Sequence, residues 1–181
     1  MRPGDPTPPV GETLYRGRKY ELRLIERPLN TGEVRQWPVI VHHGSVVIAA
    51  LHDNGLVLIE NDRHTLGRRC WELPAGTLEV DADGVVEDPL GAAHRELIEE
   101  TGFAAAKLEP RGGFYAAPGL TNEWMYLFVA TDLRHVGQRL EPDERIDARV
   151  VPWDEVDRMV ADGQLADAKS LAALALGIRP R

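Results

Sequence analysis

The chain has 181 residues, 43% of them hydrophobic and 28% charged, which is enough for one hydrophobic core of ordinary domain size. Its apolar runs fall far short of the ~20 residues that a membrane-spanning helix needs, and its N-terminus lacks the apolar core of a secretory signal. The net charge of -8 argues against binding to a nucleic-acid backbone. We therefore expect a cytoplasmic protein with no membrane or nucleic-acid partner, which would need a divalent cation to handle an anionic phosphate ester.

The N-terminal third of the chain predicts strands. Residues 1–12 are rich in Pro and Gly and should be flexible, whereas residues 15–25 are apolar enough for one or two strands. Two further β-type runs follow at residues 45–51 and 56–60. The Asn-Gly pair at residues 54–55 is a strong signal for a tight turn between them. We predict that these two runs form a β-hairpin.

A helix is predicted over Pro89–Thr101. Asp88 suits the N-cap, proline suits the first helical position, and Gly102 suits the left-handed residue that follows a helix. Downstream, residues 123–131 form a nearly continuous β-branched and aromatic run that is typical of a central buried strand. Residues 148–151 are a shorter candidate strand.

The C-terminal part predicts a helical region over residues 154–161 and 166–176, broken at Gly163. Its apolar side chains, which we expect to dock on a sheet, are Val156, Met159, Val160, Leu165, Leu171 and Leu174. A few helices mixed with several strands indicate an α+β fold.

The first predicted helix carries three carboxylates on one face: Glu96, Glu99 and Glu100. The apolar residues that we expect to face the core are Leu90, Ala93 and Leu97. Glutamates four positions apart, such as Glu96 and Glu100, repel each other by roughly 0.2–0.5 kcal/mol, and a hard divalent cation would remove this penalty. The alternative is a solvated acidic helix that is paired internally, since Arg95 and Glu99 are also four positions apart.

The whole pattern resembles the Nudix box, which has a Gly, a Glu, and then Arg-Glu-apolar-x-Glu-Glu-x-Gly-apolar, here residues 95–103. The resemblance implies an α/β/α sandwich with a mixed sheet over residues 41–181, after an N-terminal β extension, and a bound Mg²⁺ or Mn²⁺. By motif position the metal ligands would be Glu96, Glu99, Glu100 and the backbone carbonyl of Ala75, with Glu99 also counted as catalytic. Structural roles in the motif would fall to Gly76, Glu87, Arg95 and Gly102.

One spacing departs from that family. Ten residues separate Gly76 from Glu87, where the family usually has five, so residues 77–86 carry an insertion. The insertion includes Asp81, Asp83 and Gly84, a composition that suits an exposed turn. Glu79 is the alternative to Glu87 for the first Glu of the motif.

Three further segments resemble the ADP-ribose pyrophosphatase branch of the family: residues 71–76, 113–123 and 163–170. This resemblance implies cleavage of ADP-ribose to AMP and ribose 5-phosphate. It assigns substrate contacts to Arg63, Pro118 and Glu123. The family commonly dimerises through N-terminal strands, so residues 13–40 are expected to serve a homodimer.

The general base is expected outside the predicted helix, because metal-bound carboxylates are poor proton acceptors. The family places it on an acidic loop, and residues 139–145 are the suitable loop after the long strand. Glu144, near the anchored end of this loop, is the first candidate, and Glu141 is the reserve.

The sequence leaves two classes of alternative open. The first is a Nudix hydrolase for another nucleotide, such as GDP-mannose, another sugar nucleotide, an oxidised nucleoside triphosphate or a dinucleoside polyphosphate. The second is a non-catalytic Nudix-like domain that senses a nucleotide. Such domains tend to lose carboxylates of the box, whereas Glu96, Glu99 and Glu100 are all present here.

Overall fold

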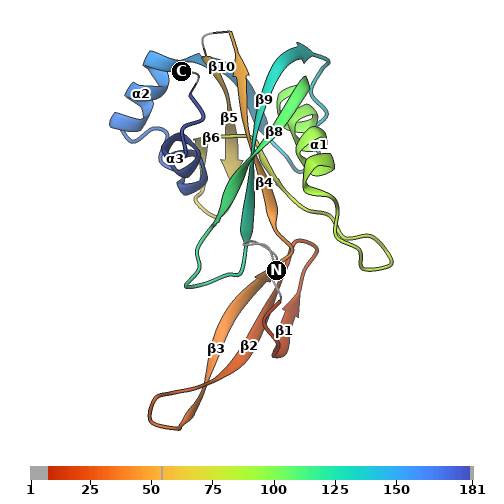
Figure 1. Cartoon of the computed structure of the whole chain (residues 1–181), viewed down its shortest axis with the longest axis vertical. Helices are drawn as coiled ribbons and strands as arrows, with labels where there is room; N and C mark the ends of the chain where they lie inside the picture. Colours follow the sequence, from red (N-terminus) through yellow and green to blue (C-terminus); the bar gives the residue numbers. More distant parts are fainter. Residues whose placement is uncertain (1–7, 54, 180–181) are drawn as a thin grey trace.

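Two β-sheets and three helices make up the computed structural model, which describes residues 8–53 and 55–179 (Figure 1). The N-terminal sheet has three antiparallel strands in the order β1-β2-β3: β1 (Glu12–Arg16), β2 (Tyr20–Pro28) and β3 (Val34–His42). This sheet projects from the rest of the molecule (Figure 1). The predicted N-terminal strands are therefore present. Of the segment expected to be flexible, residues 1–7 lie outside the described residues, and β1 already begins at Glu12.

The larger sheet is mixed, with the path β10-β5-β4-β9-β8, and β6 and β7 pair with β5 and β4. Its strands are β4 (Ser45–His52), β5 (Gly55–Arg63), β6 (Arg68–Glu72), β7 (Ala75–Thr77), β8 (Phe103–Tyr115), β9 (Trp124–His135) and β10 (Ile146–Pro152). β4 runs parallel to β9, whereas its other pairings are antiparallel. This mixed sheet agrees with the α+β prediction.

The predicted hairpin is confirmed, but only two residue pairs join its strands, Leu51 with Leu56 and His52 with Gly55. The rest of β4 pairs with β7 and β9, whereas β5 pairs with β10 over residues 55–61 and with β6 over residues 59–63. Residues 45–50 are all buried, as expected for a strand covered on both faces. Of the predicted Asn-Gly turn, Asn54 lies outside the described residues.

Helices cover both faces of the larger sheet. Helix α1 (Pro89–Thr101) packs on one face, and α2 (Trp153–Ala161) and α3 (Ala168–Ala175) pack on the other (Figure 1). Side chains alternate along β4, so that Val46 and Ile48 join the core under α1 while Val47 joins the core under α2 and α3. This arrangement confirms the expected α/β/α sandwich.

The predicted bounds of α1 are confirmed, together with their local causes. The Asp88 side chain accepts a hydrogen bond from the Gly91 amide at 3.1 Å, and Gly102 has φ of 73°. The prediction that Leu90 faces the core is wrong, because its side chain is 42% exposed. Ala92 lies in the core in its place, beside the correctly predicted Ala93 and Leu97.

The two C-terminal helices match the predicted helical region, with a break at Gly163 where φ is 71°. Val156, Met159 and Leu165 are buried as predicted, and Leu174 packs against the same core. Val160 and Leu171 are both 37% exposed, so their predicted docking is wrong.

Strands β6, β7 and β8 carry no strong sequence signal and were not predicted. Within the described residues, no helix has the length and apolar character to cross a membrane.

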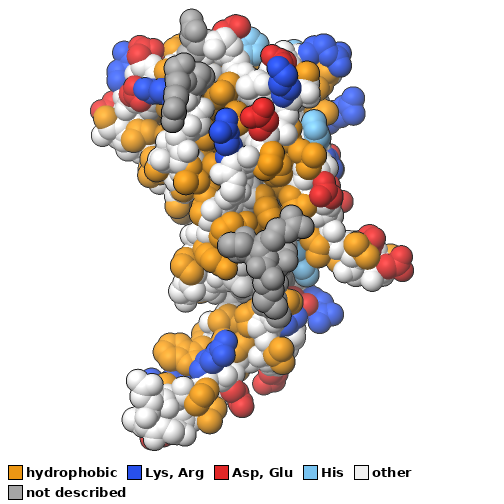
Figure 2. All heavy atoms as spheres, viewed as in Figure 1, with side chains coloured by type: hydrophobic (Ala, Val, Ile, Leu, Met, Phe, Trp, Pro, Cys, Tyr) orange, Lys and Arg blue, Asp and Glu red, His pale blue; other side chains and the backbone are white. Residues whose placement is uncertain are grey.

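Residues 79–86 of the insertion form an exposed projection between β7 and α1, as predicted (Figures 1 and 2), whereas Thr77 ends β7 and Leu78 is buried in the core under α1. The Asp81 side chain accepts hydrogen bonds from the amides of Asp83 and Val85, and Gly84 has φ of 81°. The turn is therefore closed by its own residues, and α1 keeps its regular geometry.

Candidate active site

Strand β7 lies directly against the acidic face of α1. The Ala75 amide donates a hydrogen bond to Glu100 Oε2 at 2.8 Å. A Cβ atom at Gly76 would lie 1.9 Å from the Glu96 carboxylate, so only glycine permits this approach. Two of its three carboxylates are consequently buried, with Glu96 only 8% and Glu100 3% exposed. Their burial contradicts a solvated acidic helix, although the internal pair of that alternative is present, because Arg95 donates to Glu99 at 2.9 Å.

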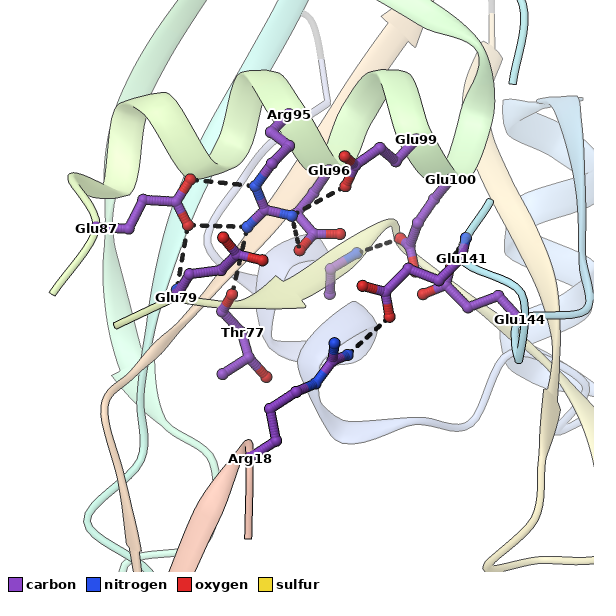
Figure 3. A network of polar contacts seen from close by, with 11 residues as sticks. Arg18, Thr77, Glu79, Glu87, Arg95, Glu96, Glu99, Glu100, Glu141 and Glu144 are labelled. Atoms are coloured by element: carbon purple, nitrogen blue, oxygen red, sulfur yellow. Dashed lines mark hydrogen bonds and ion pairs between the residues drawn. The ribbon is translucent and has the colours of Figure 1, made fainter. Parts of the chain in front are cut away.

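Arg95 connects the glutamates of the motif. Its guanidinium donates to both carboxylate oxygens of Glu87, at 3.1 and 2.8 Å, and its Nη1 donates to Glu96 at 2.7 Å and Glu99 at 2.9 Å (Figure 3). These carboxylates raise the pKa of Arg95, which stays charged. The structure thus places Glu87 against Arg95, whereas Glu79 reaches Glu87 through its backbone amide at 3.2 Å.

The two buried carboxyls have raised pKa values. Burial raises the pKa of Glu96 to about 7, against the lowering effect of Arg95. Burial and the neighbouring Glu96 raise the pKa of Glu100 to about 8. The charge of Glu144 raises both values further. Several carboxylates therefore face one another in a setting that disfavours their negative charges.

A hard divalent cation fits this arrangement, because carboxylate oxygens are the ligands that Mg²⁺ and Mn²⁺ prefer. Glu96, Glu99 and Glu100 would hold it, with the Ala75 carbonyl on the adjoining strand. Among the described residues, no three His, Cys, Asp or Glu side chains already converge as a metal cage. Arg95 Nη1 contacts Glu96 and Glu99 together, so these two carboxylates would have to turn from Arg95 towards a metal ion.

The acidic face opens into a cavity of about 890 Å³, within the usual size of a small-molecule site. The loop after β9 lines it with Glu141 and Glu144, and the turn between β1 and β2 contributes Arg18 and Lys19. Glu144 N donates to Glu141 O at 3.0 Å, and the Glu141 amide donates to the Glu144 carboxylate at 2.9 Å. Both candidate bases therefore share the cavity with the acidic face of α1 (Figure 3).

Arg63 also lines the cavity, at the end of β5, held by Glu72 of β6. Two nitrogens of Arg63 donate to the two Glu72 oxygens, at 2.7 and 2.6 Å. Lys169, at the start of α3, donates to Glu72 as well and to Asp167 at 2.8 Å. Burial alone would raise the pKa of Glu72, but Arg63 and Lys169 outweigh it and lower the pKa.

Glu72 and Lys169 were not among the predicted site residues. Both lie in segments that match the ADP-ribose pyrophosphatase branch, residues 71–76 and 163–170, so the sequence held a signal for them. The sequence gives no sign that these two residues contact each other, because 97 positions separate them.

The remaining two predicted substrate contacts lie in different settings. Glu123 lines the cavity and accepts a hydrogen bond from the Ser45 hydroxyl at 2.5 Å, with His42 Nδ1 at 3.9 Å. Pro118 lies in an exposed turn of the loop between β8 and β9 and does not line the cavity. The structure therefore brings Arg63 and Glu123 to one cavity and leaves Pro118 outside it.

Comparison with known proteins agrees with this geometry. The profile described as NUDIX domain matches residues 41–174. The chain is 35% identical over 166 residues to the ADP-ribose pyrophosphatase of Mycobacterium tuberculosis, covering 90% of this chain and 78% of that protein. It is 30% identical to the ADP-ribose pyrophosphatase of Bacillus subtilis, covering 90% and 87%. It is also 34% identical to a GDP-mannose pyrophosphatase of Enterobacter sp., over 59% of this chain and 54% of that protein.

A solved structure shares the fold. The crystal structure of an ADP compounds hydrolase superposes with a TM-score of 0.75, covering 95% of this chain and 91% of that chain at 24% identity. The matched profile spans most of the chain and includes α1 with its acidic face. The chain therefore belongs to the Nudix family of hydrolases.

Proposed function

We propose that this chain hydrolyses the diphosphate bond of ADP-ribose to AMP and ribose 5-phosphate, with Mg²⁺ or Mn²⁺ as cofactor. The observation that carries the proposal is the acidic face of α1, with Glu96 and Glu100 buried, at a cavity large enough for a small molecule. The ADP-ribose pyrophosphatase relatives match 90% of this chain. The expected cytoplasmic location remains a prediction.

Each part of the cavity has a task in this reaction. Glu96, Glu99 and Glu100, with the Ala75 carbonyl, would hold the cation, which supplies charge neutralisation at the diphosphate and lowers the pKa of water. Arg63 would donate hydrogen bonds to phosphate oxygens, for which a guanidinium is well shaped. Glu144 would accept the proton of the attacking water. Arg95 would compensate the negative charge of Glu96 and Glu99, to which it donates, and would hold Glu87 beside α1.

A nucleotide panel tests this proposal. Purified protein is assayed in Mg²⁺ and in Mn²⁺ with ADP-ribose, GDP-mannose and a nucleoside triphosphate, and products are separated by chromatography. We expect AMP and ribose 5-phosphate, with kcat/KM for ADP-ribose at least about tenfold above that for the triphosphate. Tenfold corresponds to about 1.4 kcal/mol, less than one charge-assisted hydrogen bond can contribute. Equal or faster hydrolysis of the triphosphate would contradict the proposal.

GDP-mannose is the second candidate substrate, because similar proteins include GDP-mannose pyrophosphatases. The same panel distinguishes it, since GMP and mannose 1-phosphate would then be the faster products. A nucleotide-sensing role would appear as binding of ADP-ribose by calorimetry without hydrolysis in either metal. The retained glutamates of α1 favour the enzyme.

We also propose that two copies of the chain form a dimer through the N-terminal sheet. Large apolar side chains are exposed on its strands and turn towards solvent in the single chain: Leu14, Tyr15, Tyr20, Val34 and Trp37. Orange apolar atoms on this projecting sheet are visible in Figure 2. Light scattering after gel filtration should give twice the chain mass, and Trp37→Asp should shift it towards one chain. A monomer at all concentrations would contradict a dimer.

A further inference from the structure

The turn between β1 and β2 reaches the loop that carries the candidate base. Arg18 Nη2 donates to Glu141 Oε2 at 2.8 Å, although 123 positions separate the two residues (Figure 3). Both side chains line the same cavity. A residue in the turn between β1 and β2 therefore contacts residues 139–145 within the lining of the cavity.

The two ends of this loop are fixed to the body of the molecule. The Arg139 amide donates to Glu99 O at 3.1 Å, and Gln138 Nε2 donates to Glu100 O at 2.6 Å. At the other end, Arg145 O accepts from the Asp62 amide at 3.1 Å. These contacts, each made with a backbone carbonyl, anchor the two ends of the loop but not its middle.

Residues 140–144 are held by contacts of a different kind. Glu141 and Glu144 bond to each other within the loop, through amide to carbonyl and amide to carboxylate. Arg18 makes the one hydrogen bond or ion pair, among the described residues, that joins residues 140–144 to a residue outside the loop. The Glu141 amide also orients the Glu144 carboxylate at 2.9 Å. A side chain that fixes Glu141 therefore fixes the donor that orients Glu144.

We propose that Arg18 is a positioning residue, which holds residues 139–145 through Glu141 so that Glu144 points to the acidic face of α1. The inference rests on the proposed role of Glu144 as the base. Arg18 and Glu141 are 71% and 36% exposed, so the ion pair is weak and opens readily. It therefore suits a loop that must move for substrate entry and product release, and its loss should reduce turnover without abolishing it.

Hydrogen–deuterium exchange of the metal-free protein tests the contact without any assay of activity. Arg18→Ala should raise the exchange of the peptide that covers residues 139–145, and Arg18→Lys should restore part of the protection. The matched control is Arg16→Ala, since Arg16 is equally exposed and pairs with Glu21 inside the N-terminal sheet at 2.8 Å. Unchanged exchange in Arg18→Ala, or an equal rise in Arg16→Ala, would overturn the inference.

Kinetics then test positioning against direct binding of substrate. Arg18→Ala should lower kcat roughly three- to tenfold with little change in KM, because a displaced base slows the chemical step. On a Glu144→Gln background, Arg18→Ala should cause no further loss. A raised KM with unchanged kcat would assign Arg18 to substrate binding, and additive losses in the double variant would show that Arg18 acts independently of Glu144. Either result would overturn the inference.

The two experiments also separate this inference from the proposed function. If wild-type protein hydrolyses none of the nucleotides while Arg18→Ala still raises exchange in the loop, the ion pair holds the loop but the proposed positioning of a base is overturned together with the function. If ADP-ribose is hydrolysed and the loop exchanges alike in both proteins, only the inference about Arg18 fails.

Discussion

Glu100 is buried in the metal-free chain, and burial disfavours the negative charge of its carboxylate. It is 3% exposed, and its pKa is raised to about 8 by burial and by Glu96. The Ala75 amide bonds to it, but one hydrogen bond does not offset the loss of hydration. Such a residue reduces stability at neutral pH unless a cation binds, which is the behaviour expected at a functional site rather than in a structural core.

Glu100→Gln should abolish most turnover and should remove part of the pH dependence of stability. The folded chain holds the Glu100 proton more tightly than the unfolded chain, so this contribution is complete below about pH 4.5, the ordinary value, and is lost as the pH rises towards about 8. In EDTA, the melting temperature of the variant should therefore fall less between pH 6 and pH 9 than that of wild type. Exposed Glu109→Gln serves as control and should follow wild type. Full activity of Glu100→Gln in Mg²⁺ would remove this residue from the metal site.

Glu144 and Glu141 differ in what surrounds them. The charge of Glu144 acts on Glu96 and Glu100, whereas the Glu141 carboxylate bonds to Arg18. Glu144→Gln should lower kcat by roughly 10²–10⁴, the usual contribution of a general base, with little change in KM or metal affinity. Glu141→Gln should have a smaller effect. A fall below tenfold for Glu144→Gln with a large fall for Glu141→Gln would transfer the role.

Contacts between elements place these side chains. Strand β7 positions the acidic face of α1, and Gly76 makes this approach possible. Gly102, with φ of 73°, ends α1, and a Cβ there would lie 2.8 Å from Gln138 N, next to the loop with the candidate base. The motif glycines thus join α1 to the two segments that complete the cavity.

Glu72 joins three elements, because Arg63 of β5 and Lys169 of α3 both contact this residue of β6. Glu72→Gln should cost roughly 1–3 kcal/mol of stability, since both cations lose a buried partner. For a chain of this size the melting temperature should fall by about 2–12 °C. KM should also rise, because Arg63 is no longer oriented.

Thermal melting and steady-state kinetics check the prediction for Glu72. Glu60→Gln is the matched control, since Glu60 is a glutamate of β5 that pairs with Arg69 at 3.4 Å on a more exposed surface. Stability and KM that match those of the control would show that Arg63 does not depend on Glu72.

At the scale of the whole molecule, metal binding should raise the melting temperature, because it stabilises the folded state. A ligand that binds only the folded state at 100 times its Kd stabilises it by about 2.7 kcal/mol, which corresponds to a rise of about 5–10 °C in the melting temperature. Mg²⁺ or Mn²⁺ should produce this rise in wild type after EDTA treatment. Glu100→Gln should show much less of it. A rise of equal size in the variant would mean that the ion binds elsewhere.

The sequence alone determined those features that depend on near neighbours. The bounds of α1 follow from Asp88, Pro89 and Gly102, because a cap and a left-handed residue are local matters of hydrogen bonding and φ. The glutamates of the box are recognised by their spacing on one helix. The family and the sandwich fold follow from that spacing, and both were confirmed.

Only the tertiary structure decided how distant segments meet. Strand β8 gains its order from pairing with β9, although its own residues lack a clear alternation of apolar and polar side chains. The burial of Glu96 depends on β7, the partner of Arg63 depends on β6, and the partner of Arg18 lies 123 positions away. Such contacts are set by sheet order and packing, for which the local sequence carries no direct signal.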